Sequence, residues 1–374
     1  MSKIKYPYEY DPKKRKLAKI YSKGRLMSGI INGIIIPIIF FAFFYFSGLS
    51  ASLRDIAMPM GSLAIVFYTF IFLTLIAIIQ FPLRFYSSYT YEHKYELSRY
   101  KLSGWFKDYL KSMLLFYIFT IPIAYGLFAI LPWQNWWIYA GVAYFFLSVF
   151  LSTIMPILIL PIFYKLEPYK NKKHMKKLLS MIKASGVTNV KGIYVANESA
   201  KSVKANALFS GLGKTKRIVF FDTLLNNFTP DEVETVIGHE AGHYIQKDIW
   251  RGVIIDTILI FPMLLIVDAV LKATGNMTDI ANLPLIFLTF RIIEIIIMPL
   301  TNTYSRHREA KADLFALETC RKPEAQESTE RRLVDMALAD HKPNPAIEFI
   351  FHSHPSVEKR VAMCREWKRS KRNR

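Results

Sequence analysis

Residues 236–244 read Val-Ile-Gly-His-Glu-Ala-Gly-His-Tyr and contain the pattern His-Glu-x-x-His. Residues four apart share one face of a helix, so His239 and His243 can direct their imidazoles at one metal ion. Glu240 is rotated round the helix from this pair and can reach a water at the ion, which makes it a candidate general base. The alternative is an ordinary helix face with two histidines, because a five-residue pattern also arises by chance.

The residues before this motif carry the signals of a helix start. Thr229 can be the N-cap and Pro230 suits the first helical position, while Glu232, three residues after the cap, can close a capping box. An apolar stripe follows, formed by Val233, Val236 and Ile237. These signals predict that the motif lies on a helix.

The composition of the 374-residue chain points to a membrane protein, because 52% of its residues are hydrophobic and its mean hydropathy is +0.21. Its net charge is +20, yet the basic residues gather in particular segments between apolar runs. That distribution favours membrane topology over nucleic-acid binding, and no nucleic-acid partner is predicted. Cys320 and Cys364 have neither metal-ligand nor redox spacing, so no disulfide framework is expected.

Six apolar runs are long enough to cross a bilayer as helices. They cover residues 27–48, 62–83, 112–131, 136–163, 253–271 and 283–300. Pro156 and Pro161 are expected to kink or break the fourth run near its end. The predicted fold is mostly α: a polytopic membrane protein whose six transmembrane helices form a bundle or barrel, with a cytoplasmic α+β zinc-metalloprotease domain.

Positive charge predicts the orientation of these spans. Lysine and arginine crowd the N-terminus, the loop after span two, the segment after span four and the C-terminal tail, whereas the other loops carry almost none. Basic loops stay in the cytoplasm, so both termini and the motif helix are predicted there, at the membrane surface. The basic residues of the tail, within 368–374, are expected to face anionic lipid headgroups.

The alternation of apolar runs and polar segments divides the chain into four regions. Residues 1–165 form an N-terminal membrane region with four spans, and residues 166–250 form a cytoplasmic α+β segment with the motif helix. Residues 251–300 hold spans five and six, and residues 301–374 form a cytoplasmic helical region. In the second region an amphipathic helix opens near Lys170. Short strand candidates follow at residues 192–195, 207–209 and 217–221.

A catalytic zinc site needs three protein ligands and one open position, and the residues directly after His243 offer no third ligand. A charged stretch at residues 305–313, Ser-Arg-His-Arg-Glu-Ala-Lys-Ala-Asp, follows the sixth span. Together with the motif helix, it resembles the type I CAAX prenyl endoprotease family and its bacterial HtpX-type relatives, which are gluzincins. Further motifs stand in the family's order at residues 81–100, 206–225 and 353–355. The resemblance therefore covers most of residues 60–365.

The resemblance implies that Glu309 is the third ligand of one Zn²⁺ per chain, beside His239 and His243. A surface glutamate in a charged helix is the alternative to this assignment. Asp313 lies four residues after Glu309 on the same helical face, where it can orient a ligand or neutralise a basic side chain. Its alternative is a solvated helix charge.

Four further positions take a role from the resemblance. His354 matches a family histidine near the metal and would donate a hydrogen bond to the oxyanion or the substrate carbonyl. Arg360 matches an arginine near the site and would pair with Asp313. Asn206 and Ala207 begin an apparent edge strand that would bind the substrate backbone by β-augmentation, with Asn206 positioning the scissile peptide. The alternative for Asn206 is a structural role, as an asparagine that ends a turn.

Four charged residues lie inside the predicted spans, where hydrocarbon disfavours them, so their side chains are expected to point inward. They are Asp256, Asp268, Arg291 and Glu294. Arg291 and Glu294 are three residues apart and can pair on one face. The family's water-filled chamber would house these groups. A structural ion pair between helices is the alternative.

Together these features predict a zinc-dependent membrane metalloendopeptidase that cleaves membrane-associated peptides or proteins, either prenylated or membrane-embedded. Its partners would be such substrates and membrane lipids. The family's eukaryotic members are longer and carry a seventh span. A bacterial or archaeal cell membrane is therefore favoured over the endoplasmic reticulum, with the active site on the cytoplasmic side.

Two other functions stay open at this point. A site-2-type intramembrane protease would carry the motif inside a span, whereas here the motif follows a strand-containing segment and a capping box. A polytopic transporter or scaffold with a structural zinc site and no proteolysis is the second alternative. Such a structural site usually has four protein ligands.

Overall fold

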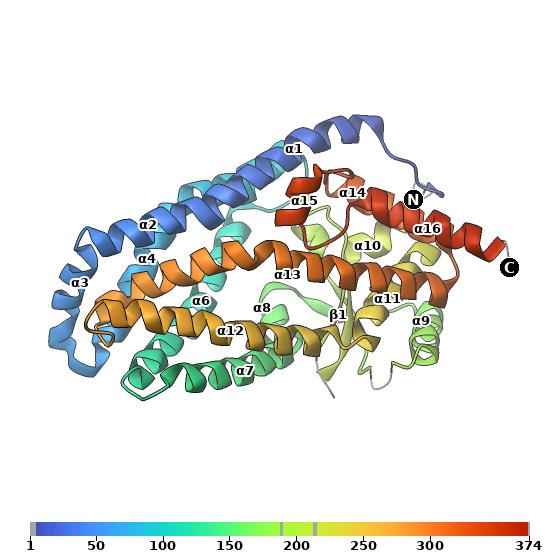
Figure 1. Cartoon of the computed structure of the whole chain (residues 1–374). Coiled ribbons are helices and arrows are strands. Elements are labelled where there is room, and N and C mark those ends of the chain that lie inside the picture. Colours follow the sequence, from blue (N-terminus) through green and yellow to red (C-terminus); the bar gives the residue numbers. More distant parts are fainter. Residues whose placement is uncertain (1–4, 188–189, 212–214, 373–374) are drawn as a thin grey trace.

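The computed structural model describes residues 5–187, 190–211 and 215–372. Part of the motif at 206–225 and the end of the basic tail therefore lie outside the described residues. The molecule is elongated: long helices run along most of its length, and a small sheet with shorter helices occupies the end at which both termini lie (Figure 1). The predicted fold class, mostly helical with an α+β region, is confirmed.

Six helical segments in the described part of the chain are long and apolar enough to cross a membrane, as predicted. Their bounds are Pro12–Phe46, Leu49–Lys94, Leu102–Ile130, Trp136–Phe163, Asp248–Ala273 and Ile280–Cys320. The N-terminus and the C-terminus lie at the same end of this bundle (Figure 1), as an even number of crossings requires.

Several spans consist of more than one helix. Their elements are α1 (Pro12–Ile30) and α2 (Ile36–Phe46), then α3 (Leu49–Ala57), α4 (Ala64–Phe85) and α5 (Tyr91–Lys94), α6 (Leu102–Ile130), α7 (Trp136–Ile154) and α8 (Leu160–Phe163), α12 (Asp248–Ala273), and α13 (Leu283–Cys320). Pro156 lies in the π-helical turn between α7 and α8. The predicted break in the fourth span is present there, because proline has no N–H to donate within a helix.

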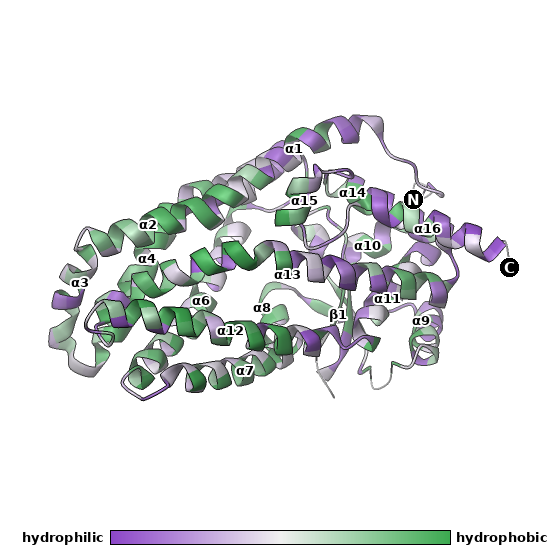
Figure 2. Ribbon diagram, viewed as in Figure 1, coloured by the Kyte–Doolittle hydropathy of each residue, from purple (hydrophilic) through white to green (hydrophobic). Residues whose placement is uncertain are grey.

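The helices are apolar at the end away from the termini (Figure 2). Hydrophobic residues cover α2, α4, α7, α12 and the first half of α13, whereas the second half of α13 and the C-terminal helix α16 (Val357–Arg372) are hydrophilic (Figure 2). One helix, α13, thus runs from the apolar zone into the polar zone without interruption.

The expectation that the basic tail faces lipid headgroups stays a prediction. Helix α16 lies beside α14 (Pro323–Met336), at the end of the molecule opposite the apolar helices (Figure 1). Carboxylates of α14 pair with two basic residues of this helix. Lys368 Nζ lies 2.5 Å from Glu324 Oε1, and Arg365 Nη2 lies 2.8 Å from Glu327 Oε1.

The sheet has four strands in the order β1-β2-β4-β3. They are β1 (Leu166–Pro168), β2 (Ile193–Ala196), β3 (Ala207–Ser210) and β4 (Arg217–Phe221). The three predicted strands are confirmed, and β1, which is too short for a sequence pattern, is additional. Strand β2 runs parallel to β4, whereas β3 is antiparallel to β4 and forms an edge of the sheet.

The motif helix is α11 (Pro230–Ile245), and it begins with the predicted capping box. Thr229 Oγ1 accepts a hydrogen bond from the Glu232 amide at 3.3 Å, and Glu232 Oε2 accepts one from the Thr229 amide at 2.7 Å. These bonds satisfy amides that a helix N-terminus leaves unpaired. Ser328 and Arg332 of α14 also donate to the Glu232 carboxylate, so the helix start is fixed to its neighbour.

One face of α11 packs into a core with the sheet and two flanking helices, α9 (Lys172–Ala184) and α10 (Asp222–Asn227). Its buried residues on this face are Val233, Ile237 and Ala241. His239 and His243 each follow such a residue by two positions, which turns them to the opposite face of the helix. The core therefore decides the direction in which the imidazoles point.

Small residues bring α13 very close to α11. A Cβ added at Gly242 would lie 3.0 Å from the Ala312 Cα, and one added at Gly238 would lie 3.2 Å from the Ala316 Cα and 2.6 Å from the Cys320 Sγ. A side chain at either glycine would separate the helices. Glu309 lies three residues before Ala312, so this approach carries its carboxylate to the histidine face of α11.

The charges inside the spans have different surroundings. Asp268 is buried, accepts a hydrogen bond from Trp136 Nε1 at 2.8 Å and pairs with Lys272 at 2.6 Å. Arg291 and Glu294 form the predicted pair at 2.9 Å. For these two residues and Asp256, an orientation toward a chamber stays a prediction.

Replacing Gly242 by valine should destabilise the protein by about 1–3 kcal/mol, because the added side chain collides with the α13 backbone. The measurement is the thermal unfolding midpoint of the purified protein in detergent. Gly252→Val is the matched control, since a Cβ at Gly252 of α12 meets no atom within 4 Å. Equal midpoints for the two variants would contradict the close packing of α11 and α13.

Candidate metal centre

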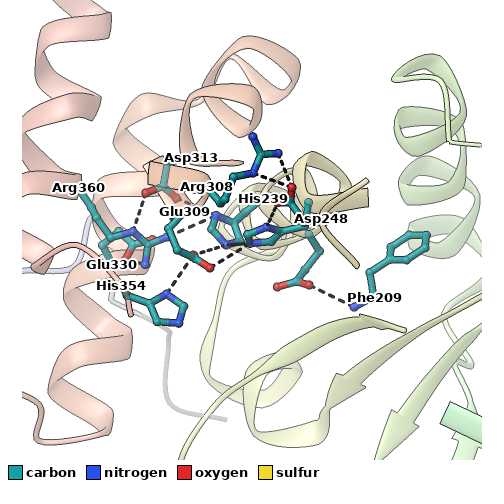
Figure 3. A network of polar contacts seen from close by, with 11 residues as sticks. Phe209, His239, Asp248, Arg308, Glu309, Asp313, Glu330, His354 and Arg360 are labelled. Atoms are coloured by element: carbon teal, nitrogen blue, oxygen red, sulfur yellow. Dashed lines mark hydrogen bonds and ion pairs between the residues drawn. The ribbon is translucent and has the colours of Figure 1, made fainter. Parts of the chain in front are cut away.

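Two histidines of α11 and a glutamate of α13 converge on one point. The ligand atoms that His239, His243 and Glu309 offer all lie within 4.8 Å of one another. The two Nε2 atoms are 3.0 Å apart, and they lie 3.3 and 3.4 Å from Glu309 oxygens. Figure 3 shows His239 and Glu309 pointing toward each other. The structure therefore brings together the three side chains that were predicted as ligands.

The hydrogen bonds of the two imidazoles fit a metal ion. Asp313 Oδ1 lies 2.8 Å from His239 Nδ1, and Asp248 Oδ2 lies 2.8 Å from His243 Nδ1. A carboxylate at Nδ1 holds the proton there, which leaves a lone pair on each Nε2. Two lone pairs facing each other at 3.0 Å repel unless a cation, either a proton or a metal ion, lies between them.

The spacing of the ligand atoms agrees with the same conclusion. Tetrahedral ligands at about 2.0–2.1 Å from zinc stand roughly 3.3 Å from one another. The three observed separations of 3.0, 3.3 and 3.4 Å are close to that value. Glu309 Oε2 is buried and accepts no hydrogen bond of good geometry from the described residues, although it lies near two imidazoles. An ion would supply its missing partner.

The electrostatics of the site favour positive charge between the imidazoles. Burial lowers the pKa of His239, but the neighbouring carboxylates of Asp313 and Glu309 outweigh it and raise the pKa to about 10. Burial also lowers the pKa of His243, and the neighbouring carboxylates of Asp248 and Glu309 raise it to about 9. Carboxylates that stabilise a proton so strongly also stabilise a metal ion at the same place.

Asp313 is held in turn by Arg360, as the sequence analysis expected. Arg360 Nε and Nη2 donate to the two Asp313 oxygens at 2.7 and 2.5 Å, and its Nη1 lies 2.6 Å from Glu330 Oε2. Glu330, which the sequence analysis missed, is only 4% exposed. Burial raises its pKa to about 7, although Arg360 lowers it. A buried chain of charges therefore runs from Glu330 to the His239 imidazole.

The partners of His243 were also missed. Asp248 stands on the first turn of α12, directly after the motif helix, and Arg308 of α13 donates to its Oδ1 from Nε at 2.7 Å. Figure 3 shows Asp248 and Arg308 on one side of the site, and Asp313 and Arg360 on the other. An aspartate five residues after a ligand histidine was the available signal, but only the sharp turn into α12 brings it back to the ring.

Glu240 lies beside the edge strand. The Phe209 amide of β3 donates to Glu240 Oε2 at 3.2 Å (Figure 3). Burial raises the pKa of this carboxyl above its usual range. A carboxylate with a raised pKa takes up and releases a proton more readily near neutral pH, which suits a general base.

The remaining predicted residues surround the same point. Asn206 Oδ1 accepts a hydrogen bond from the Ala207 amide at 2.9 Å, at the start of β3. His354 lies in the connection between α15 (Pro345–Phe351) and α16, with its Nδ1 3.0 Å from Glu309 Oε2 and 62% of its side chain exposed. A cavity of about 190 Å³ is lined by Asn206, Ala207, His239, Glu240 and His354, among others. All nine predicted site residues thus lie in or next to one site.

Two family models match the chain. Residues 168–368, more than half of the chain, match the model of peptidase family M48. Residues 6–165 match the family model described as CAAX prenyl protease N-terminal, five membrane helices. In that range the described chain has four apolar helical segments of spanning length.

Three individual proteins resemble the chain over most of their length. The uncharacterized metalloprotease YhfN of Bacillus subtilis is 29% identical over 343 residues, which cover 87% of this chain and 80% of the relative. CAAX prenyl protease 1 of Saccharomyces cerevisiae is 29% identical over 319 residues, 77% of this chain and 69% of the relative. The crystal structure of S. mikatae Ste24p has the same fold, with a TM-score of 0.81 at 23% identity, covering 94% and 88%.

Replacing Asp248 by asparagine should weaken metal binding by roughly 10- to 100-fold, because the His243 ring loses the carboxylate that fixes its tautomer. The measurement is competition for the metal with a chelator of known affinity. Asp231→Asn is the matched control, since Asp231 lies at the other end of α11 and pairs with Lys322. Unchanged affinity in Asp248→Asn would show that this contact does not support the ligand.

Proposed function

We propose that this chain, which belongs to peptidase family M48 and is a multi-pass membrane metalloendopeptidase, binds one Zn²⁺ through His239, His243 and Glu309. Two histidines and one glutamate with an open position are the ligand set of catalytic zinc. The observation that carries the proposal is the pair of imidazoles at 3.0 Å, each held at Nδ1 by a carboxylate.

Zinc in such a site lowers the pKa of water toward about 7 and polarises the carbonyl to be attacked. Glu240 takes the proton of the attacking water and delivers it to the leaving amine. The raised pKa of the Glu240 carboxyl and its place between the ligands and β3 support this role. His354, exposed on the open side of Glu309, donates a hydrogen bond to the developing oxyanion.

The substrate adds as a strand to the free edge of β3. Asn206 lies at the start of this edge and Ala207 forms its first residue, beside the cavity that contains His239 and Glu240. Arg360 and Asp313 do not touch the substrate backbone in this scheme. They hold the His239 ring, so they are positioning residues.

The active site faces the cytoplasm, at the end of the molecule that carries both termini. Basic residues crowd the loops on this side, which supports the orientation. The substrates are membrane-associated peptides and proteins. They are either prenylated C-terminal peptides, as the name of the Saccharomyces relative suggests, or damaged membrane proteins. Membrane lipids surround the six spans, nucleic acid is no partner, and a bacterial or archaeal membrane is in keeping with the Bacillus subtilis relative.

Two alternatives receive less support. A site-2-type intramembrane protease would need its motif in a span, but α11 is not among the six spanning segments of the described chain. A transporter or scaffold with structural zinc would need a fourth protein ligand. In the described residues the group that can hold a metal contains His239, His243 and Glu309.

Replacing Glu240 by glutamine should keep the fold and one zinc per chain while kcat falls by roughly 10²- to 10⁴-fold, because the base is lost. The measurements are zinc content and cleavage of a quenched peptide by the detergent-purified protein. His239→Ala should lose the zinc itself. A fully active Glu240→Gln protein would overturn the assignment of the base.

A cleavage assay with three substrates separates the substrate classes. The substrates are a lipidated CAAX-type peptide, the same peptide without its lipid, and an unfolded membrane protein. The proposal expects cleavage of at least one of them, and chelation of the metal should abolish it. Cleavage that persists with the chelator would contradict a zinc mechanism.

A further inference from the structure

A cavity of about 420 Å³ lies apart from the metal centre and shares no lining residue with the cavities that Glu240 lines. Part of its wall comes from residues 81–100, a stretch that carries the family resemblance but takes no part in the metal centre. The wall residues from this stretch are Arg84, Ser88, Glu92, Ser98 and Tyr100. The proposed hydrolysis leaves this cavity, which we call the Arg84 cavity, without a role.

The Arg84 cavity lies at the depth of the lipid headgroups. Arg84 is in the last turn of α4, Trp105 is near the start of α6, and Phe163 ends α8. These are the ends of spans two, three and four that are predicted to lie on the cytoplasmic side. Aromatic residues that favour this depth in membrane proteins form much of the wall. They are Tyr100, Trp105, Tyr109 and Tyr164.

Arg84 is the cation of this cavity that lacks an anionic partner among the described residues. The other cations of the wall each pair with a carboxylate of the same wall, Asp108 or Glu92, at 2.6 to 3.4 Å. They are Arg25, Lys201 and Lys204. The Arg84 side chain is exposed, and its guanidinium carbon lies 5.4 Å from the centre of the Tyr109 ring. A guanidinium held in this way is suited to bind a phosphate.

Glu198 is the carboxylate of the cavity that lacks a partner for one oxygen. The residue is 7% exposed, and its Oε1 accepts a hydrogen bond from the Ser202 hydroxyl. Its Oε2 is buried and accepts no hydrogen bond of good geometry from the described residues, although Tyr164 lies close to the carboxylate. The two lysines of the wall pair with other carboxylates. A buried carboxylate is unfavourable without a counter-charge, so a cationic donor from outside the chain would stabilise it.

A guanidinium without an anion and a carboxylate without a cation, in one cavity, match a ligand that carries both charges. We propose that the Arg84 cavity binds the headgroup of a phospholipid with a phosphate and a primary ammonium, as in phosphatidylethanolamine. The phosphate pairs with Arg84, and the ammonium donates a hydrogen bond to Glu198 Oε2. A choline headgroup carries the same charges, but it has no N–H and cannot make this bond. The bound headgroup connects α4 to the segment that precedes β3.

An apolar stripe on α6 provides a surface for the acyl chains of this lipid. The residues of α6 that line the cavity recur at helical spacing and share one face. They are Trp105, Asp108, Tyr109 and Ser112. On the adjacent face Phe106, Leu110 and Leu114 follow one another at intervals of four residues and are 39%, 58% and 59% exposed. This stripe runs from the level of the cavity toward the middle of span three, which favours a membrane lipid over a soluble phosphate ester.

Four probes test the proposal on the full-length protein in detergent. They are short-chain phosphatidylethanolamine, phosphatidylcholine and phosphatidylglycerol with the same acyl chains, and glycerophosphoethanolamine, which has none. The rise of the thermal unfolding midpoint with probe concentration gives an apparent dissociation constant for each. We expect phosphatidylethanolamine to bind roughly 10- to 100-fold more tightly than the other three, because it alone brings both the charged hydrogen bond to Glu198 and the acyl chains.

Equal affinities for the three lipids would overturn the recognition of the headgroup. Glycerophosphoethanolamine that binds as tightly as phosphatidylethanolamine would overturn the assignment of a lipid as the occupant.

Two variants assign the contacts within the cavity. Glu198→Gln should lower the affinity for phosphatidylethanolamine to that for phosphatidylcholine, because the amide has no charge for the ammonium. Glu167→Gln is its control, since Glu167 lies on β1 and pairs with Lys165 outside the cavity. A preference for phosphatidylethanolamine that survives in Glu198→Gln, or is lost equally in the control, would contradict the role of Glu198.

Arg84→Gln should weaken the binding of all three lipids by roughly 10-fold, because each of them carries the phosphate. Since Arg84 is exposed, this variant is expected to fold. Lys107→Gln is the matched control, because Lys107 is an exposed cation of α6 that does not line the cavity. Unchanged lipid affinities in Arg84→Gln, or an equal loss in Lys107→Gln, would overturn the phosphate contact.

Discussion

Two imidazoles whose Nδ1 atoms are each held by a carboxylate, and whose Nε2 atoms consequently face each other, are the interaction on which the rest of the site depends. Each carboxylate would be disfavoured in a buried position without a counter-charge. Arg360 supplies that charge to Asp313 and Arg308 supplies it to Asp248. The ligand set is therefore oriented from two sides, by arginines that come from different helices.

The membrane helices take part in this geometry directly. Asp248 stands at the start of span five, and Glu309 stands on the polar continuation of span six. The approach of α11 to α13 at Gly238 and Gly242 then sets the distance between the glutamate and the histidines. Hydrolysis and membrane insertion are thus properties of the same helices, which explains why the site lies where the apolar zone ends (Figure 2).

Much of this could be predicted from sequence, because the signals are local. Capping at Thr229, the apolar runs and the short strands each depend on residues close together in the chain. Glu309 could be assigned only through a family resemblance, since its distance from His239 along the chain carries no geometric information. Glu330 and Arg308 were missed because an isolated charge on a helix looks the same whether it is solvated or buried. The pairing of Lys368 in the tail with Glu324 of α14 was missed for the same reason.

The most direct test of the account is X-ray absorption at the zinc edge of the purified protein, compared between the native chain and Glu309→Ala. The account predicts one zinc per chain with two imidazole nitrogens and carboxylate oxygen at about 2.0–2.2 Å. For Glu309→Ala it predicts one of two results. Either the variant loses the metal, or it keeps zinc on both imidazoles and its spectrum lacks the carboxylate contribution. Sulfur ligands, or a spectrum of bound zinc that the Glu309 substitution leaves unchanged, would contradict it.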